Sequence, residues 1–176
     1  MVIVAFLLAG LTSGSTAGSS NTPSTGPLGA VTVSPPPNDP AAQGPCTALI
    51  GALPLRLAGL DVRPAVSKPS SPFIVAWGQP AIVLRCGTAR PRGFTTTSEV
   101  IAVNGVNLFP DKQGDATVFT VVDRPVYLDV TVPASYPQPP LGPLMTVVAK
   151  TLKQVCTANQ AGQPNVPPRQ LCVNRR

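Results

Sequence analysis

The residues with the clearest potential for chemistry are four cysteines, Cys46, Cys86, Cys156 and Cys172, in a chain of 176 residues that contains no histidine. A zinc site built from four cysteines usually shows closely spaced Cys-x-x-Cys pairs, and this sequence has none. The absence of histidine also removes the mixed Cys and His sites. We therefore predict no metal and no cofactor, and we interpret the even number of cysteines as disulfides.

The spacing of apolar residues selects one pairing among the three that four cysteines allow. Cys46, Leu49, Ile50 and Leu53 recur at helical spacing and predict a short helix between Pro45 and Pro54. Ala81–Cys86 predicts a strand that places Cys86 on its apolar face with Ile82 and Leu84. Since both sulfurs then point toward a core, we predict a Cys46–Cys86 bond. The remaining cysteines would form Cys156–Cys172, which would pin the C-terminal tail to a second helix.

Other catalytic arrangements find little support in the sequence. Histidine, the commonest general base, is absent, and the acids comprise one glutamate, Glu99, and six aspartates. No serine stands in a Gly-x-Ser-x-Gly context. We therefore expect a protein that is not an enzyme. The alternative is an enzyme or redox protein that uses a free cysteine, Cys86 or Cys156, as its reactive group.

Basic residues suggest the kind of partner. The formal net charge is +6, and bases are concentrated between Arg56 and Arg92, which favours contact with anionic groups. Four arginines, Arg85, Arg90, Arg92 and Arg124, are candidate anion-binding residues. No basic segment interleaved with aromatics is present, so nucleic acid is not an expected partner. Trp77 could stack on a ligand, although a tryptophan before a turn more often packs in a core.

The N-terminal region predicts export. Residues 1–11 are apolar, too few to span a bilayer but of the length of a signal-peptide core. No Lys or Arg precedes them, so residues 1–20 are either a signal-like segment or part of an anchor. A linker rich in Pro, Gly and Ser follows over 21–45, and we expect one folded domain over 46–176. The predicted location is extracytoplasmic, either secreted or tethered to the outer face of the membrane through residues 1–11.

The rest of the chain predicts an α+β fold. Only 11% of residues are charged but 43% are apolar, which is enough for a core. Asn104-Gly105 between apolar runs predicts a two-residue hairpin in which Val103 faces Val106 and Ile101 faces Leu108. Strands are also expected over Thr117–Val122 and Val126–Val132, a polar loop over Asp111–Asp115, an irregular stretch over Arg56–Pro72 and a second helix over Leu141–Cys156. We expect an antiparallel sheet of about five strands with two helices packed on one face, stapled by disulfides.

Several of these motifs together resemble a known family. Cys46 followed by Leu53-Pro54, the turn Trp77-Gly78-Gln79-Pro80, the strand Ile82–Gly87 and the segment Thr120–Arg124 are similar to an actinobacterial family catalogued as domain of unknown function 3515. The resemblance spans roughly Cys46–Val155. It implies a small secreted or membrane-anchored envelope protein and brings no activity with it. An Asp commonly follows Trp-Gly in that pattern, and Gln79 in its place argues against an essential carboxylate there.

The functional hypothesis that follows is an exported cell-envelope protein that acts as a non-catalytic binding or accessory module. Its expected partner is an envelope protein or an anionic envelope component.

Overall fold

The computed structural model describes residues 28–95, 97–156 and 170–171. Within these ranges, no helix has both the length and the apolar character that crossing a membrane requires. The predicted signal-like segment, residues 1–20, lies outside them.

An eight-stranded sheet forms the centre of the fold, and its neighbouring strands all pair in antiparallel fashion. In spatial order its strands are β2 (Arg56–Leu57), β3 (Leu60–Arg63), β5 (Ile74–Trp77), β6 (Ile82–Thr88), β10 (Tyr127–Pro133), β9 (Ala116–Val121), β8 (Val106–Gln113) and β7 (Ile101–Val103). The α+β class is as predicted, but the expectation of about five strands was wrong. Three strands of this sheet were not predicted. β2 and β3 lie in the stretch predicted to be irregular, where they are too short to show an alternating pattern, and β5 lies just before the predicted turn at Gly78.

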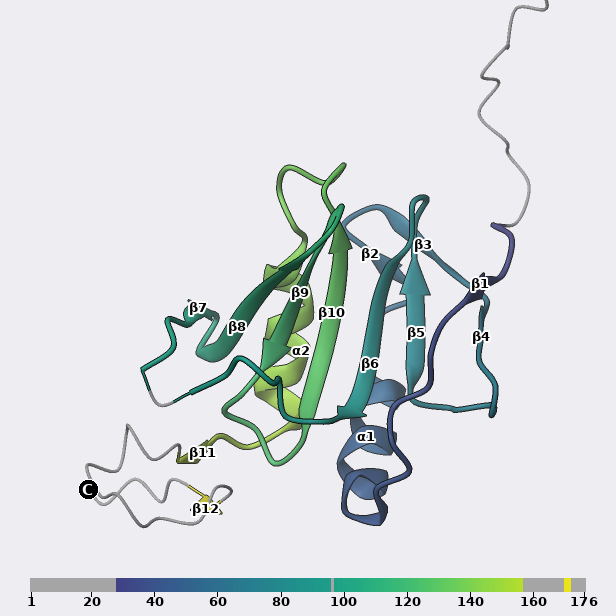
Figure 1. Cartoon of the computed structure of the whole chain (residues 1–176). Coiled ribbons are helices and arrows are strands. Elements are labelled where there is room, and N and C mark those ends of the chain that lie inside the picture. The colour runs from purple at the N-terminus through teal and green to yellow at the C-terminus, as the bar shows by residue number, and fades with distance from the viewer. Residues whose placement is uncertain (1–27, 96, 157–169, 172–176) are drawn as a thin grey trace, which may run out of the picture.

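Two small pairings flank this sheet. β1 (Val31–Thr32) pairs in parallel with β4 (Ala65–Val66), and β11 (Val155–Cys156) pairs in antiparallel fashion with β12 (Gln170–Leu171). The chain before the first helix runs down one side of the sheet in Figure 1. Arg63 fastens it there, because its Nε donates a 2.9 Å hydrogen bond to the carbonyl of Gly29. Ordered structure therefore extends into the 21–45 segment that we predicted as a linker.

Helix α1 (Pro40–Ala52) begins six residues before the predicted start at Cys46. The Asp39 side chain caps its first turn by accepting a hydrogen bond from the N–H of Ala41 (2.9 Å), and Pro40 occupies the first turn, where a missing N–H is harmless. Pro45, which we took as the boundary, lies inside the helix. Cys46 and Leu49 occupy its buried face, as the spacing predicted.

Helix α2 (Leu141–Thr151) ends before the predicted Cys156, because Leu152 adopts an extended backbone conformation and the chain continues into β11. The N–H of Val155 then bonds to the carbonyl of Asp123 at 2.9 Å, a contact between distant segments that local periodicity does not encode. The helices also pack differently from our expectation. α2 lies across the inner face of the sheet, whereas α1 lies near the end of β6 and contacts both β6 and α2 (Figure 1).

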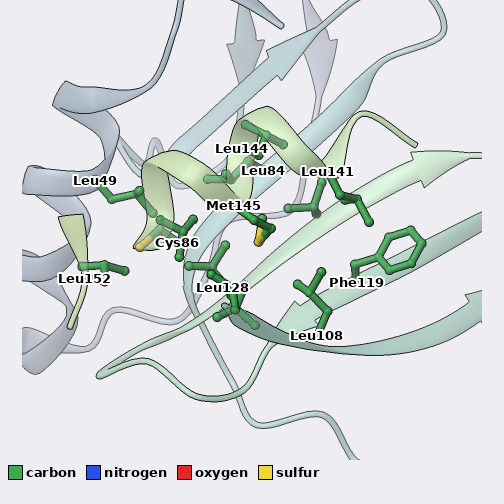
Figure 2. Close-up of a cluster of buried hydrophobic side chains, with 14 of the residues drawn as sticks. Leu49, Leu84, Cys86, Leu108, Phe119, Leu128, Leu141, Leu144, Met145 and Leu152 are labelled. Atoms are coloured by element: carbon green, nitrogen blue, oxygen red, sulfur yellow. The ribbon is translucent and has the colours of Figure 1, made fainter. Parts of the chain in front are cut away.

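The core lies between α2 and the inner face of the sheet. Figure 2 shows Leu141, Leu144 and Met145 of α2 gathered with Leu108, Phe119 and Leu128 of the strands. Alternation along each strand places these apolar residues inward and sends their sequence neighbours to the opposite, outer face. That division positions the candidate site described below.

The predicted hairpin is confirmed in its register: Val103 pairs with Val106, and Ile101 pairs with Leu108. Asn104 and Gly105 have φ of 51° and 75°, the left-handed values that a type I′ turn requires. The predicted polar loop over Asp111–Asp115 was wrong, because β8 continues to Gln113 before the turn. Its polar residues belong to a strand whose side chains there are exposed, so polarity did not mark a loop.

Candidate functional site

A row of polar side chains crosses the outer face of the sheet. Arg85 on β6 lies opposite Asp129 on β10, and Asp129 lies opposite Thr120 on β9. All three sit between residues that point into the core, so alternation sends them outward together. Three strands far apart in sequence therefore bring a cation, a carboxylate and a hydroxyl into one line.

These three side chains are joined by direct contacts. Nη2 of Arg85 lies 2.9 Å from Oδ2 of Asp129, and Oγ1 of Thr120 donates a 2.8 Å hydrogen bond to Oδ1 of the same carboxylate. The side chains of Arg85 and Asp129 are only 25% and 12% exposed. Both carboxylate oxygens of Asp129 thus have partners, which leaves this group poorly placed to act as a general base.

A cleft of about 200 Å³ opens over this row. In Figure 1 the loop after β6 runs past the lower ends of β10 and β9 on its way to β7. This loop, together with β6, β8, β9 and β10, lines the cleft with Arg85, Ala89, Pro91, Arg92, Gly93, Asp111, Gln113, Val118, Thr120 and Asp129. We call this hollow the outer-face cleft.

Aromatic contacts hold the loop beside the sheet. The guanidinium carbon of Arg90 lies 5.0 Å from the ring centre of Phe94, and its Nη2 donates to the Phe94 carbonyl at 2.8 Å. The Phe94 ring in turn lies 5.4 Å from the ring of Phe109 on β8. Arg90 therefore stabilises the wall of the cleft and is not among the residues that line it.

The four arginines predicted to bind an anion are thus only partly brought together. Arg85 and Arg92 line the outer-face cleft, and Arg90 supports its loop. Arg124 was wrongly included, because it is buried and its side chain is only 3% exposed. Its Nη1 lies 2.9 Å from Oδ2 of Asp123, and its Nη2 donates to the carbonyl of Gly105 at 2.9 Å.

The Asp123–Arg124 pair joins three segments of the chain. Arg124 reaches the β7–β8 hairpin through Gly105, and Gln154, beyond α2, donates a 3.2 Å hydrogen bond to Oδ2 of Asp123. Burial raises the pKa of Asp123 above its ordinary value of 3.8, and the charge of Arg124 opposes that rise. The pair has a structural role and is not open to ligands.

Trp77 does not stack on a ligand. Its side chain is fully buried, and its Nε1 donates a 3.0 Å hydrogen bond to the carbonyl of Pro54. The proposed ligand-stacking role was wrong, and the core position that a tryptophan before a turn more often takes is the one observed.

The predicted Cys46–Cys86 disulfide is confirmed. It joins α1 to β6, and both residues are fully buried in the core. Because an oxidised sulfur is no nucleophile, neither Cys46 nor Cys86 is available for thiol chemistry. The predicted Cys156–Cys172 bond falls outside the described side chains.

The outer-face cleft offers groups for recognition by charge and hydrogen bonding. Its lining contains no Cys, Ser, Lys or Tyr, and in the described part of the chain no three His, Cys, Asp or Glu residues gather where they could hold a metal ion. We did not single out Asp129, Thr120, Asp111 or Gln113 from the sequence. The sequence did contain one signal for Asp129. This residue lies on the polar side of an alternating strand, as Arg85 does, so the two could have been expected on the same face of the sheet.

Comparisons with known proteins identify a family. No curated protein and no solved structure matches the chain. The model of the family described as "Protein of unknown function (DUF3515)" matches residues 1–157. This range begins well before Cys46, where we expected the resemblance to start, and it includes the apolar residues 1–11 and Cys156 but not Cys172. The resemblance recognised in the Trp77-Gly78-Gln79-Pro80 turn and its neighbouring motifs is confirmed, and the chain belongs to the DUF3515 family.

Proposed function

We propose that this protein is an exported accessory module of the cell envelope that binds, without catalysis, a polar component bearing an anionic group in its outer-face cleft. The observation that supports export most strongly is the Cys46–Cys86 disulfide. Disulfides form and persist in oxidising compartments outside the cytoplasm and are rare inside it. The bond joins α1 to β6 and is fully buried, so it cross-links two elements of the core.

The N-terminal sequence supports the same location. Residues 1–11 are apolar and have the length of a signal-peptide core, and the family match includes them. The segment therefore serves as the export signal or, if retained, as a tether to the outer face of the membrane.

Binding is favoured over catalysis by the state of the polar groups in the cleft. Both carboxylate oxygens of Asp129 are engaged, one by Arg85 and the other by Thr120. Arg85 and Arg92 supply fixed positive charge, which attracts anionic groups but performs no proton transfer at neutral pH. The competing function, an enzyme or redox protein with a reactive Cys86 or Cys156, requires that cysteine to be reduced.

The test is mass spectrometry of the protein from the envelope fraction of its native host. The protein is denatured in an alkylating reagent, so that buried thiols can react, with or without prior reduction. We expect the peptides containing Cys46 and Cys86 to take up label only after reduction. Free labelling of either cysteine without reduction, or recovery of the protein only in the cytoplasmic fraction, would refute the proposal and favour the redox alternative.

A further inference from the structure

The charges that line the outer-face cleft are balanced, which is unusual for a simple anion site. Two arginines, Arg85 and Arg92, share the lining with two aspartates, Asp111 and Asp129. Asp129 is already engaged by Arg85 and Thr120. The groups left for a ligand are therefore the guanidinium of Arg92, part of that of Arg85, and the carboxylate of Asp111.

The two arginines retain unused donors. Arg92 is exposed and makes no ion pair or hydrogen bond with another described residue. Arg85 gives one terminal nitrogen, Nη2, to Asp129, and its Nε is buried, so its other terminal nitrogen, Nη1, is the donor left for a ligand. An oxyanion is the group that complements guanidinium donors best.

Asp111 retains unused acceptor capacity. It is exposed on β8, and its Oδ2 accepts a 2.8 Å hydrogen bond from the Gln113 amide. No lysine or arginine in the described part of the chain forms an ion pair with it. A free carboxylate in the same cleft repels a pure anion, but it attracts a ligand that also carries a cationic group.

The strand register separates the two kinds of group. Arg85 and Asp111 lie three strands apart and two residues out of line, which places their Cα atoms roughly 16 Å apart from ordinary strand spacings. The side chains of both residues shorten that gap. A ligand of about 10 Å would bridge it, and an extended chain of three residues spans about that length. At about 200 Å³ the cleft is smaller than the clefts of about 300–1,000 Å³ that take drug-sized ligands, which restricts it to a small molecule.

We propose that the outer-face cleft takes a short dipolar molecule of peptide type, with its carboxylate toward Arg85 and Arg92 and its ammonium group toward Asp111. This proposal rests on the proposed binding function and specifies its ligand class. It differs from simple anion binding because tight binding requires both the carboxylate and the ammonium group of the ligand.

The test is a titration of the full chain with three matched probes at low ionic strength. Binding is measured from the changes in ¹⁵N NMR spectra of the protein. Triglycine carries both charges, N-acetyltriglycine only the carboxylate, and triglycinamide only the ammonium group. We expect triglycine to bind at least about three-fold more tightly than either blocked form, because each exposed charge pair contributes a few-fold in affinity. The shifted amides should include those of Gly93 and Gln113.

Two substitutions test the two ends of the ligand separately. Asp111→Asn should weaken triglycine binding by about three- to five-fold while leaving N-acetyltriglycine unchanged or bound more tightly. Arg92→Gln should weaken both. Both residues are exposed, so their replacement should not unfold the protein. Arg56→Gln, which removes an exposed arginine paired with Asp61 outside the cleft, is the matched control and should change neither affinity.

Equal binding of triglycine and N-acetyltriglycine, or an Asp111→Asn variant with unchanged triglycine affinity, would overturn the dipolar ligand and leave an anion site. Absence of binding by all three probes would also overturn it. The thiol-labelling result would then still decide separately whether the protein is an exported disulfide module.

Discussion

Replacing Cys46 and Cys86 together by alanine should reduce the free energy of unfolding by about 4 kcal/mol. The bond closes a loop between residues separated by 40 positions. In the chain-entropy treatment, opening a loop of this length stabilises the unfolded chain by about that amount at 25 °C. Loss of two fully buried sulfurs from the core adds to the effect.

The assay is equilibrium urea unfolding of the two proteins, with Cys156 and Cys172 left unaltered in both. If the disulfide acts through the unfolded chain, the variant should also show a larger dependence of unfolding free energy on urea, because its unfolded state exposes more surface. Leu49→Ala on the same helix is the matched control. Leu49 is fully buried, so truncating it should cost about 2–5 kcal/mol through lost packing without changing the urea dependence.

A loss below about 1 kcal/mol in the double variant, with unchanged urea dependence, would refute this reasoning. It would mean that α1 is held against β6 by packing alone and that the bond contributes little.

Two further predictions concern the glycine next to Cys86 in β6 and the buried acid Asp123. Gly87→Ala should destabilise the protein by about 2–5 kcal/mol, because φ there is +83° and a new Cβ would lie 3.0 Å from the Cβ of Ala42. Gly105→Ala, at φ +75° with no atom within 4 Å of its Cβ, should cost only the strain of about 1–2 kcal/mol, and equal losses in thermal or urea unfolding would contradict this. Because the folded protein raises the pKa of Asp123, the stability that this group contributes should be complete below pH 3.8 and should be lost as pH rises through its folded pKa. Asp123→Asn should remove this fall in the free energy of unfolding between acid and neutral pH. If the variant shows the same fall, other titrating groups cause it.

Patterns local in sequence were sufficient to predict several features of the fold and one of the site. Asn104-Gly105 between apolar runs was sufficient for the hairpin and its register, because a two-residue turn fixes which flanking residues pair. Helical spacing around Cys46 and strand alternation around Cys86 placed both sulfurs toward the core, which was enough to select their bond. Alternation also sent Arg85 outward.

Tertiary structure decided the rest because the deciding contacts join segments far apart in the chain. No local pattern distinguishes Arg85 from Arg124. Arg85 pairs with Asp129 and lines the cleft, whereas Arg124 is buried against Asp123. The outer-face cleft exists only because the order of β6, β10, β9 and β8 brings their outward side chains together beneath a loop. The sequence by itself determined which side chains of the alternating strands face in or out and that Cys46 and Cys86 can meet, since these follow from local period. Which outward residues become neighbours was decided by strand order, a non-local property that no local pattern encodes.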